Sequence, residues 1–213
     1  MTQIPDLAHF VRAAWAAGQS AKLDGIGYGR ITWGNETEVL TDCGDWEIYL
    51  FLNGVVSLIG AKSILEIGTH WGGSARAMAR GMKEGGKIVT VDKSEESDAV
   101  LPTCPESTMI QKIVGDANSF EVIEQVYDAL PSADIIFIDA THAALPTLQS
   151  LTTYSLLLRP TYVLIDDITL NDSMVRFWKL VRKTYPDRSI DCHEVEAVRQ
   201  PHVGFGLIYM PTV

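Results

Sequence analysis

The chain has 213 residues, 46 % of them hydrophobic, which suits one globular domain with a sizeable core. Its 27 acidic and 17 basic residues give a formal charge of −10, and the basic residues form no run, so we expect no nucleic-acid or membrane partner. The N-terminus does not read as a secretory leader, and Cys43, Cys104 and Cys192 are too far apart to suggest a disulfide framework. We therefore expect a cytoplasmic protein with reduced thiols.

An N-terminal segment precedes the predicted sheet. Residues 6–17 carry apolar side chains at helical spacing before Gly18, which predicts an amphipathic helix that could also mediate a homodimer. Residues 23–45 have an irregular composition that is typical of either a connector or a lid over a pocket, and Tyr28 and Trp33 favour the lid. We divide the chain into this helix-and-lid segment, residues 1–45, and a main domain, residues 46–213.

Strands and helices alternate through the main domain, after a first helix at residues 46–58. Strands are expected at residues 64–68, 87–92, 109–114, 135–139, 162–166, near 190–195 and 204–210. Helices are expected at residues 74–82, 120–130, 142–158 and 173–185. In the third of these, Leu145, Leu148 and Leu151 form a stripe that we expect to face the sheet. The pattern predicts an α/β fold, Rossmann-like and doubly wound, whose mostly parallel seven-stranded sheet ends in an antiparallel hairpin.

Ligands of such sheets bind beyond the carboxyl ends of the strands, and each of the first five predicted strands ends in a carboxylate. The first strand leads into a glycine turn, where Gly68 and Gly72 admit a close backbone approach and His70 is a candidate pocket residue. This turn departs from the glycine fingerprint of dinucleotide sites. Because Glu66 beside it would repel a phosphate, a ligand with positive charge is favoured, such as the ammonium and sulfonium of S-adenosylmethionine.

Three further residues are candidates for this donor site. Asp92 follows Gly68 at close to the roughly 20-residue spacing of an acid that binds ribose hydroxyls, although it could be a surface turn residue. Asp116 could accept a hydrogen bond from an adenine amino group or cap its own loop. Ser74 could cap the next helix, contact the donor's carboxylate, or do both.

Asp139 and Asp166 end two strands that one helix connects, so a right-handed crossover would make the strands neighbours, about 4.8 Å apart. With Asp167 they offer three oxygen donors, which favour Mg²⁺ or another hard divalent cation. Consecutive strand residues point to opposite faces, so Asp167 joins the site only if the strand ends before it. Otherwise Asp167 caps the next loop.

Several of these motifs resemble class I S-adenosylmethionine-dependent methyltransferases. The resemblance rests on residues 64–69 with Gly72 and Ser74, on Val91-Asp92 and on residues 115–117. Residues 138–139 and 165–167 resemble the metal-dependent O-methyltransferase branch that includes catechol O-methyltransferase, and Thr32-Trp33-Gly34, Asp45-Trp46 and Asp139-x-x-His142 resemble cephalosporin hydroxylase-like proteins.

The resemblance implies methyl transfer from S-adenosylmethionine to a hydroxyl of a catechol or vicinal diol, in a natural product or sugar. It implies that the donor is bound by Glu66, Gly68, Thr69, Gly72, Ser74, Asp92, Asp116 and Ala117. The metal ligands would be Asp139, Asp166 and Asp167, and His142 is the hypothetical catalytic base beside Asp139. Two rivals stay open: a cephalosporin hydroxylase-like oxidoreductase and a non-catalytic partner subunit that keeps the pocket.

Overall fold

The structure is a computed structural model that describes residues 4–26, 29–33, 36–40, 47–99, 101–195 and 204–211. Its main sheet has seven strands: β3 (Ser63–Ile67), β4 (Lys87–Asp92), β5 (Ile110–Val114), β6 (Ile135–Ile138), β7 (Tyr162–Asp166), β8 (Ser189–Asp191) and β9 (Phe205–Tyr209). The order across the sheet is β5-β4-β3-β6-β7-β9-β8. The first five strands of this order are parallel, while β9 runs antiparallel to both β7 and β8. This confirms the predicted fold and its antiparallel C-terminal hairpin.

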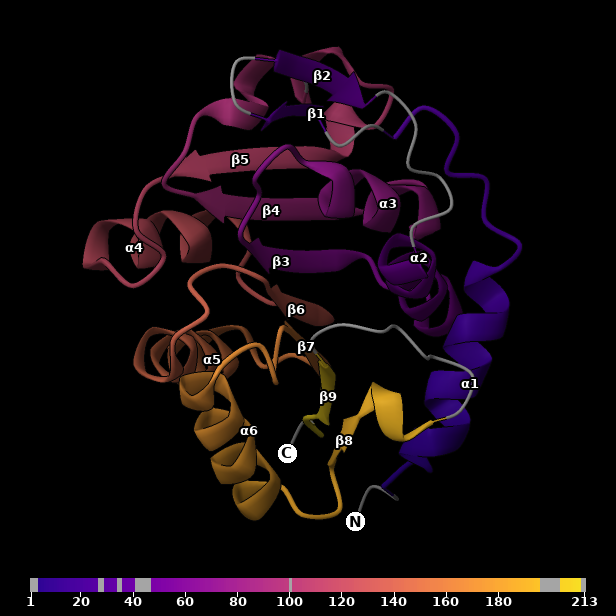
Figure 1. Cartoon of the computed structure of the whole chain (residues 1–213), viewed down its shortest axis with the longest axis vertical. Helices are drawn as coiled ribbons and strands as arrows, with labels where there is room; N and C mark the ends of the chain where they lie inside the picture. The colour runs from indigo at the N-terminus through magenta and orange to yellow at the C-terminus, as the bar shows by residue number, and fades with distance from the viewer. Residues whose placement is uncertain are drawn as a thin grey trace.

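Helices cover both faces of this sheet. One face packs against α1 (Leu7–Gly18), α2 (Glu47–Ile59) and α3 (Gly73–Gly81), and the other against α4 (Phe120–Ala129), α5 (Ala144–Leu158) and α6 (Asp172–Thr184). Figure 1 shows α1 and α2 to the right of the sheet and α4, α5 and α6 to its left. Strand residues alternate between the two resulting cores, as Ile64 and Leu65 do, so the strands read as continuous apolar runs.

Local signals in the sequence explain where several helices begin. The side chains of Asp6, Ser119 and Asn171 accept hydrogen bonds from the backbone N–H groups of His9, Val122 and Met174 at the starts of α1, α4 and α6. Four 3-10 helices complete the elements: η1 (Glu96–Ala99), η2 (Leu101–Thr103), η3 (Ser107–Met109) and η4 (Cys192–Glu194). The last of these shortens the strand predicted near residues 190–195 to β8.

The segment predicted to be irregular contains a hairpin. Strands β1 (Gly29–Trp33) and β2 (Glu36–Leu40) pair antiparallel and form a separate two-stranded sheet. The alternation of polar and apolar residues that marks a strand is too short here to stand out among the Gly, Thr and Asn residues. Tyr28, Gly34, Cys43 and Asp45-Trp46 lie outside the described residues.

The predicted leucine stripe of α5 is wrong in one position. Leu151 is buried and Leu148 is half-buried, but the side chain of Leu145 is 74 % exposed. Each step of three residues falls about 60° short of a full turn in a helix with 3.6 residues per turn, so Leu145 and Leu151 point about 120° apart, and Leu145 turns away from the sheet. Thr147 and Tyr154 take part in the buried face instead.

Two remaining expectations from composition can be compared with the structure. Cys104 and Cys192 are buried free thiols, while Cys43 is outside the described residues. Among the helices of the described ranges, none has the length and apolar character needed to cross a bilayer.

Candidate active site

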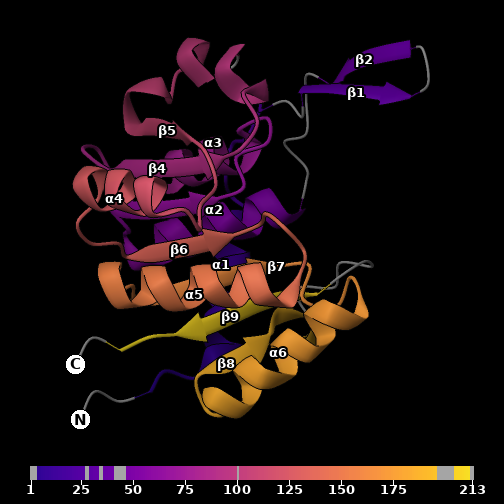
Figure 2. The same cartoon turned by 90° about the vertical axis from the view of Figure 1, so that its left-hand side faces the viewer.

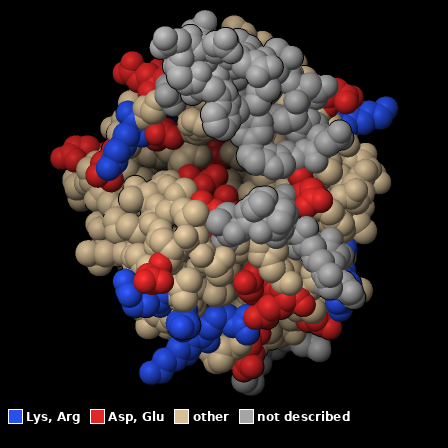
Figure 3. All heavy atoms as spheres, in the orientation of Figure 1, with Lys and Arg blue, Asp and Glu red and all other residues tan. Residues whose placement is uncertain are grey.

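A cavity of about 630 Å³ lies at the carboxyl ends of β3, β4, β5 and β6. Its walls come from the loops that follow these strands and from the first turns of α5. Figure 3 shows a hollow near the centre of one face of the molecule, with acidic side chains gathered in it. Four of the five strand ends that the sequence predicted to form a site therefore lie at this cavity.

The glycine turn after β3 forms one wall and is held in an unusual backbone conformation. Gly68 has φ 105°, and a Cβ atom there would lie 1.7 Å from the backbone oxygen of Asp139. Gly72 has φ 81°, and a Cβ atom there would meet Leu101 at 2.5 Å. Only glycine fits either position. His70 lines the cavity with φ 43°, and its backbone N–H donates to Asp92 over 2.7 Å.

Glu66 lies beneath this turn and is fully buried. Its two carboxylate oxygens accept hydrogen bonds from the hydroxyls of Ser74 and Thr90, and the Thr90 oxygen lies 2.6 Å from that of Thr69. Burial is the main cause that raises the pKa of Glu66 to about 8, and the hydroxyls only partly oppose it. The carboxyl group is therefore largely protonated at neutral pH.

The predicted donor residues fall into two groups. Gly68, Asp92, Asp116 and Ala117 line the cavity, while Glu66, Thr69, Gly72 and Ser74 are not part of its walls. Ser74 does not cap α3, since its hydroxyl donates to Glu66 and the N-cap residue is Gly72. The second group supports the turn from behind.

Asp92 and Asp116 have backbone partners close to them in sequence. Asp92 accepts hydrogen bonds from the N–H groups of His70 and Ser94, at 2.7 and 2.9 Å. Asp116 accepts from the Asn118 N–H at 3.0 Å and pairs with Lys93 at 2.9 Å. These contacts, that of Asn118 first, lower the pKa of Asp116. Asp116 thus caps its own loop, and its contact with an adenine stays a prediction.

The acids of β6 and β7 meet at the other end of the cleft. These strands are parallel neighbours, as the crossover argument predicted. Nε2 of His142 lies 3.0 Å from Oδ2 of Asp167 and 3.4 Å from Oδ1 of Asp139, without the angles of a hydrogen bond. The close approach of the Asp139 carboxylate, and then that of Asp167, favours the protonated imidazole and raises the pKa of His142 to about 10.

Asp166 completes this acidic group, and Asp167 reaches it through an unusual conformation. Burial first, then repulsion from Asp139 and Asp167, raises the pKa of Asp166 to about 8. The strand ends at Asp166, and Asp167 has φ 57°, in the left-handed region. This turn breaks the alternation of side chains, so Asp167 faces the site instead of the opposite side of the sheet.

The chemistry of this group suits a hard cation, because it offers carboxylate oxygens that repel one another. Its arrangement is not a ready set of ligands. Across the described ranges, no group of three or more His, Cys, Asp or Glu side chains is placed to hold a metal ion. In this structure the imidazole of His142 lies between Asp139 and Asp167 and partly compensates their charge.

Several residues that line the cavity were not predicted from the sequence. Asn118 follows the acidic loop after β5, and its side-chain oxygen accepts from the hydroxyl of Ser150 at 3.0 Å. Gln149 donates to the Asn118 backbone oxygen at 3.4 Å. Asn118 is recognisable as the next residue of a strand-end loop, but Gln149 and Ser150 sit on a helix and look like surface residues.

Comparison with known proteins agrees with this architecture. Three solved structures share the fold: an O-methyltransferase from Bacillus cereus in complex with SAH, the O-methyltransferase TomG from Streptomyces achromogenes, involved in tomaymycin synthesis, in complex with SAM, and cofactor-bound Rv0187 from MTB. The TM-scores are 0.61, 0.61 and 0.60, at 22 %, 21 % and 18 % identity. The matches cover 95 %, 76 % and 99 % of this chain and 91 %, 78 % and 98 % of the other chains, respectively.

A family model gives the more specific result. Residues 36–177 match the model described as O-methyltransferase, which is well over half of the 213 residues. The matched range contains the glycine turn and the acids of all five parallel strands. The chain belongs to the O-methyltransferase family.

Proposed function

We propose that this enzyme moves a methyl group from S-adenosylmethionine to one hydroxyl of a catechol or vicinal diol. A divalent cation, Mg²⁺ first, would be held by Asp139, Asp166 and Asp167. The observation that carries the proposal is the convergence of these acids around His142, beside a cavity that Asp139 and His142 line, in a member of this family. The SAM of TomG and the SAH of the Bacillus cereus protein, at the same fold, support the choice of donor.

The donor would lie along the loops after β3, β4 and β5, which we call the donor side. Here Gly68 lines the cavity, and Asp92 offers its remaining acceptor capacity to ribose hydroxyls. Glu66 would support the donor side without touching the donor, because its hydrogen bonds join the start of α3 to the adjacent strand β4.

The acceptor would lie beside Asp139, Asp166, Asp167 and His142, which we call the acceptor side. When bound, a divalent cation supplies positive charge that polarises the acceptor oxygens and compensates the carboxylates. Two neighbouring hydroxyls suit such a cation better than one. This is why a catechol or vicinal diol is the proposed acceptor.

His142 is the proposed base. With Asp139 and Asp167 compensated, the cause of its raised pKa is removed, and Nε2 can accept the hydroxyl proton near neutral pH. The acceptor oxygen then attacks the methyl carbon, the bond from that carbon to sulfur breaks, and S-adenosylhomocysteine leaves. The products are a methyl ether, neutral S-adenosylhomocysteine and one proton on His142.

The test measures S-adenosylhomocysteine formed by the full chain after treatment with EDTA. Catechol and cis-1,2-cyclohexanediol are the acceptors, phenol is the control with a single hydroxyl, and each is assayed with and without Mg²⁺. We expect turnover only with a diol and Mg²⁺. Equal rates without the metal would overturn metal dependence, and equal rates with phenol would overturn chelation. Tight S-adenosylhomocysteine binding with no turnover of any diol would favour the non-catalytic partner subunit.

A further inference from the structure

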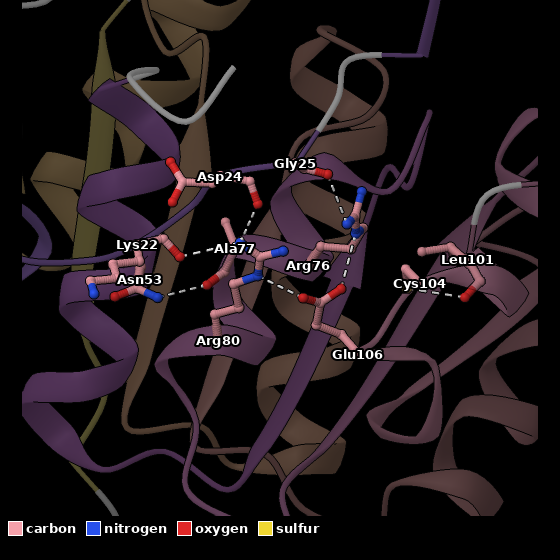
Figure 4. Close-up of polar contacts among 10 residues, drawn as sticks. All are labelled: Lys22, Asp24, Gly25, Asn53, Arg76, Ala77, Arg80, Leu101, Cys104 and Glu106. Carbon is pink, nitrogen blue, oxygen red and sulfur yellow. Dashed lines mark hydrogen bonds and ion pairs between the residues drawn. The ribbon is translucent and has the colours of Figure 1, made fainter. Parts of the chain in front are cut away.

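A charged cluster outside the cavity joins three separate segments of the chain. Arg76 and Arg80 lie one turn apart on α3, and both point to the carboxylate of Glu106, as Figure 4 shows. Nε of Arg76 is 3.1 Å from Oε2 of Glu106, and Nε of Arg80 is 2.6 Å from Oε1. We call these three residues the arginine–glutamate cluster.

Two of the three residues are buried, and the positive charges of the cluster exceed its negative charge. Arg76 and Glu106 are 6 % and 7 % exposed, so neither charge is solvated well by water. Despite burial, hydrogen bonds from Arg80 and Arg76 hold the pKa of Glu106 below its usual value. One carboxylate therefore faces two guanidinium groups, and the remaining N–H donors need other acceptors.

Backbone oxygens of residues 22–25 supply those acceptors. Arg76 donates to the oxygen of Gly25 at 3.0 Å, and Arg80 donates to those of Lys22 and Asp24, at 3.2 and 2.8 Å (Figure 4). Charge-assisted hydrogen bonds of this kind are stronger than neutral ones. They hold residues 22–25 against α3. Because the acceptors are backbone oxygens, this contact does not depend on the side chains of residues 22–25.

The three segments all lead to the proposed active site. Helix α3 begins at the glycine turn, and the segment that carries Glu106 also carries Leu101, which packs against Gly72 of that turn. Residues 22–25 precede the hairpin β1–β2, which begins at Gly29. Figure 2 shows this hairpin projecting on the side toward which the parallel strand β6 points, the side of the cavity.

We infer that the arginine–glutamate cluster positions the base of the β1–β2 hairpin relative to the donor turn, and thereby the acceptor. Arg76, Arg80 and Glu106 are positioning residues, since none of them lines the cavity. The inference rests on the proposed function for its effect on the acceptor. Its structural part, that the cluster holds residues 22–25, can be tested without any acceptor.

The experiment compares Glu106→Gln with the wild-type chain. Glutamine keeps the size of the side chain but turns an N–H₂ group toward one arginine, so a guanidinium is released from the cluster. The matched control is Glu194→Gln, which removes an exposed pair with Arg182 at 3.1 Å, on the opposite edge of the sheet. Arg80→Ala is the second variant, because Arg80 is nearer to solvent and its loss should leave the chain folded.

Hydrogen–deuterium exchange of peptides from residues 19–40 is the first readout. We expect exchange there to rise about tenfold or more in Glu106→Gln and Arg80→Ala, and to stay unchanged in β3, β4 and in Glu194→Gln. Calorimetry with S-adenosylhomocysteine should show a Kd within about twofold of wild type. The substitutions loosen residues 19–40, and effects at distant sites are usually independent, so binding at the donor side should change little. Unchanged exchange in residues 19–40 would overturn the inference.

Steady-state kinetics with catechol and Mg²⁺ is the second readout. We expect KM for catechol to rise about tenfold while KM for S-adenosylmethionine stays within about twofold. Raised exchange with an unchanged KM for catechol would show that the cluster is structural only, and would overturn the positioning role. A wild-type enzyme without methyl transfer would count against the proposed function, and the exchange data would still decide whether the cluster holds the segment.

Discussion

At the donor side of the cleft, each acidic side chain has its own partners within the protein. Asp92 accepts two backbone N–H groups, and Glu66 accepts two hydroxyls. At the acceptor side, by contrast, Asp139 and Asp167 share one histidine, and Asp166 is crowded by both. The donor side is satisfied by the fold itself, while the acceptor side gathers charges that the fold leaves incompletely compensated.

This difference indicates what each side is built to do. A site whose polar groups already have partners is rigid before its ligand arrives, which suits a bulky cofactor used in every turnover. At the acceptor side, repulsion from Asp139 and Asp167 contributes to the raised pKa of Asp166, and a bound cation would relieve that repulsion. Substitutions at the two sides should therefore have different consequences.

The largest effect is expected at the acceptor side from Asp139→Asn, which keeps the shape of the side chain but removes a charge. We expect methyl transfer to catechol with Mg²⁺ to fall on the order of 10³-fold, because several kcal/mol of charge stabilisation would be lost. The Kd for S-adenosylhomocysteine, from calorimetry, should change little. Asp191→Asn, at the far edge of the sheet, is the control. If Asp139→Asn transferred methyl groups as fast as Asp191→Asn, the proposed role of Asp139 at the acceptor side would be refuted.

His142→Gln should lower kcat by about 10²-fold, the scale of one lost general base. The matched control is His193→Gln, whose histidine pairs with Asp191 away from the cavity. Rates are measured at saturating donor and Mg²⁺ across pH 5 to 9. If the variant kept both the wild-type kcat and its pH profile, another group would have to take the proton.

On the donor side, Asp92→Asn should weaken binding of S-adenosylhomocysteine by roughly 10-fold, because an amide accepts the His70 and Ser94 N–H groups less well than a carboxylate. Asp98→Asn, which weakens a surface contact with Lys112, serves as the control. Calorimetry measures both. A loss of kcat with an unchanged Kd for S-adenosylhomocysteine would contradict the role of Asp92 in donor binding.

The smallest effect on activity is expected for Glu66→Gln, which should instead change how stability depends on pH. The pKa of Glu66 is about 8 in the folded chain against 4.5 as the ordinary value, so folding takes up a proton between these limits. Stability from this group is complete below about pH 4.5 and is lost as pH rises toward 8. Glutamine does not ionise, so the variant's Tm should rise relative to that of wild type from pH 5 to pH 8.

Thermal unfolding at several pH values checks this prediction. Asp166 also has a raised pKa, but it titrates in both proteins and cancels in the difference. A constant difference in Tm across the range would mean that Glu66 stays ionised in the folded chain.

The sequence was sufficient for the sheet and for the acids at its strand ends, because alternation and crossover length determine which ends are neighbours. It predicted Asp139 beside Asp166 for this reason. It left open whether Asp167 joins them, since the left-handed backbone at Asp167 depends on how the chain turns after β7. The place of Glu66 beneath the turn also needed the structure, because a buried acid and a ligand-binding acid look the same in sequence.

Contacts between distant segments were the least predictable. Arg76 and Arg80 read as ordinary helix-surface residues, and Glu106 lies in a loop, so no local pattern joins them to residues 22–25. The hairpin β1–β2 was missed because its strands are short and lie outside the main sheet. Gln149 and Ser150 reach the cavity only because α5 packs next to the loop after β5.

Gly68 has a consequence for how this enzyme can change over evolution. Its missing side chain lets the backbone of the turn after β3 touch the backbone of Asp139, so the spacing between the ends of β3 and β6 is set by main-chain atoms. Mutations elsewhere can reshape the acceptor pocket without altering that spacing. New substrates are therefore accessible by changes in surrounding loops, whereas even an alanine at this one position would disturb both halves of the reaction together.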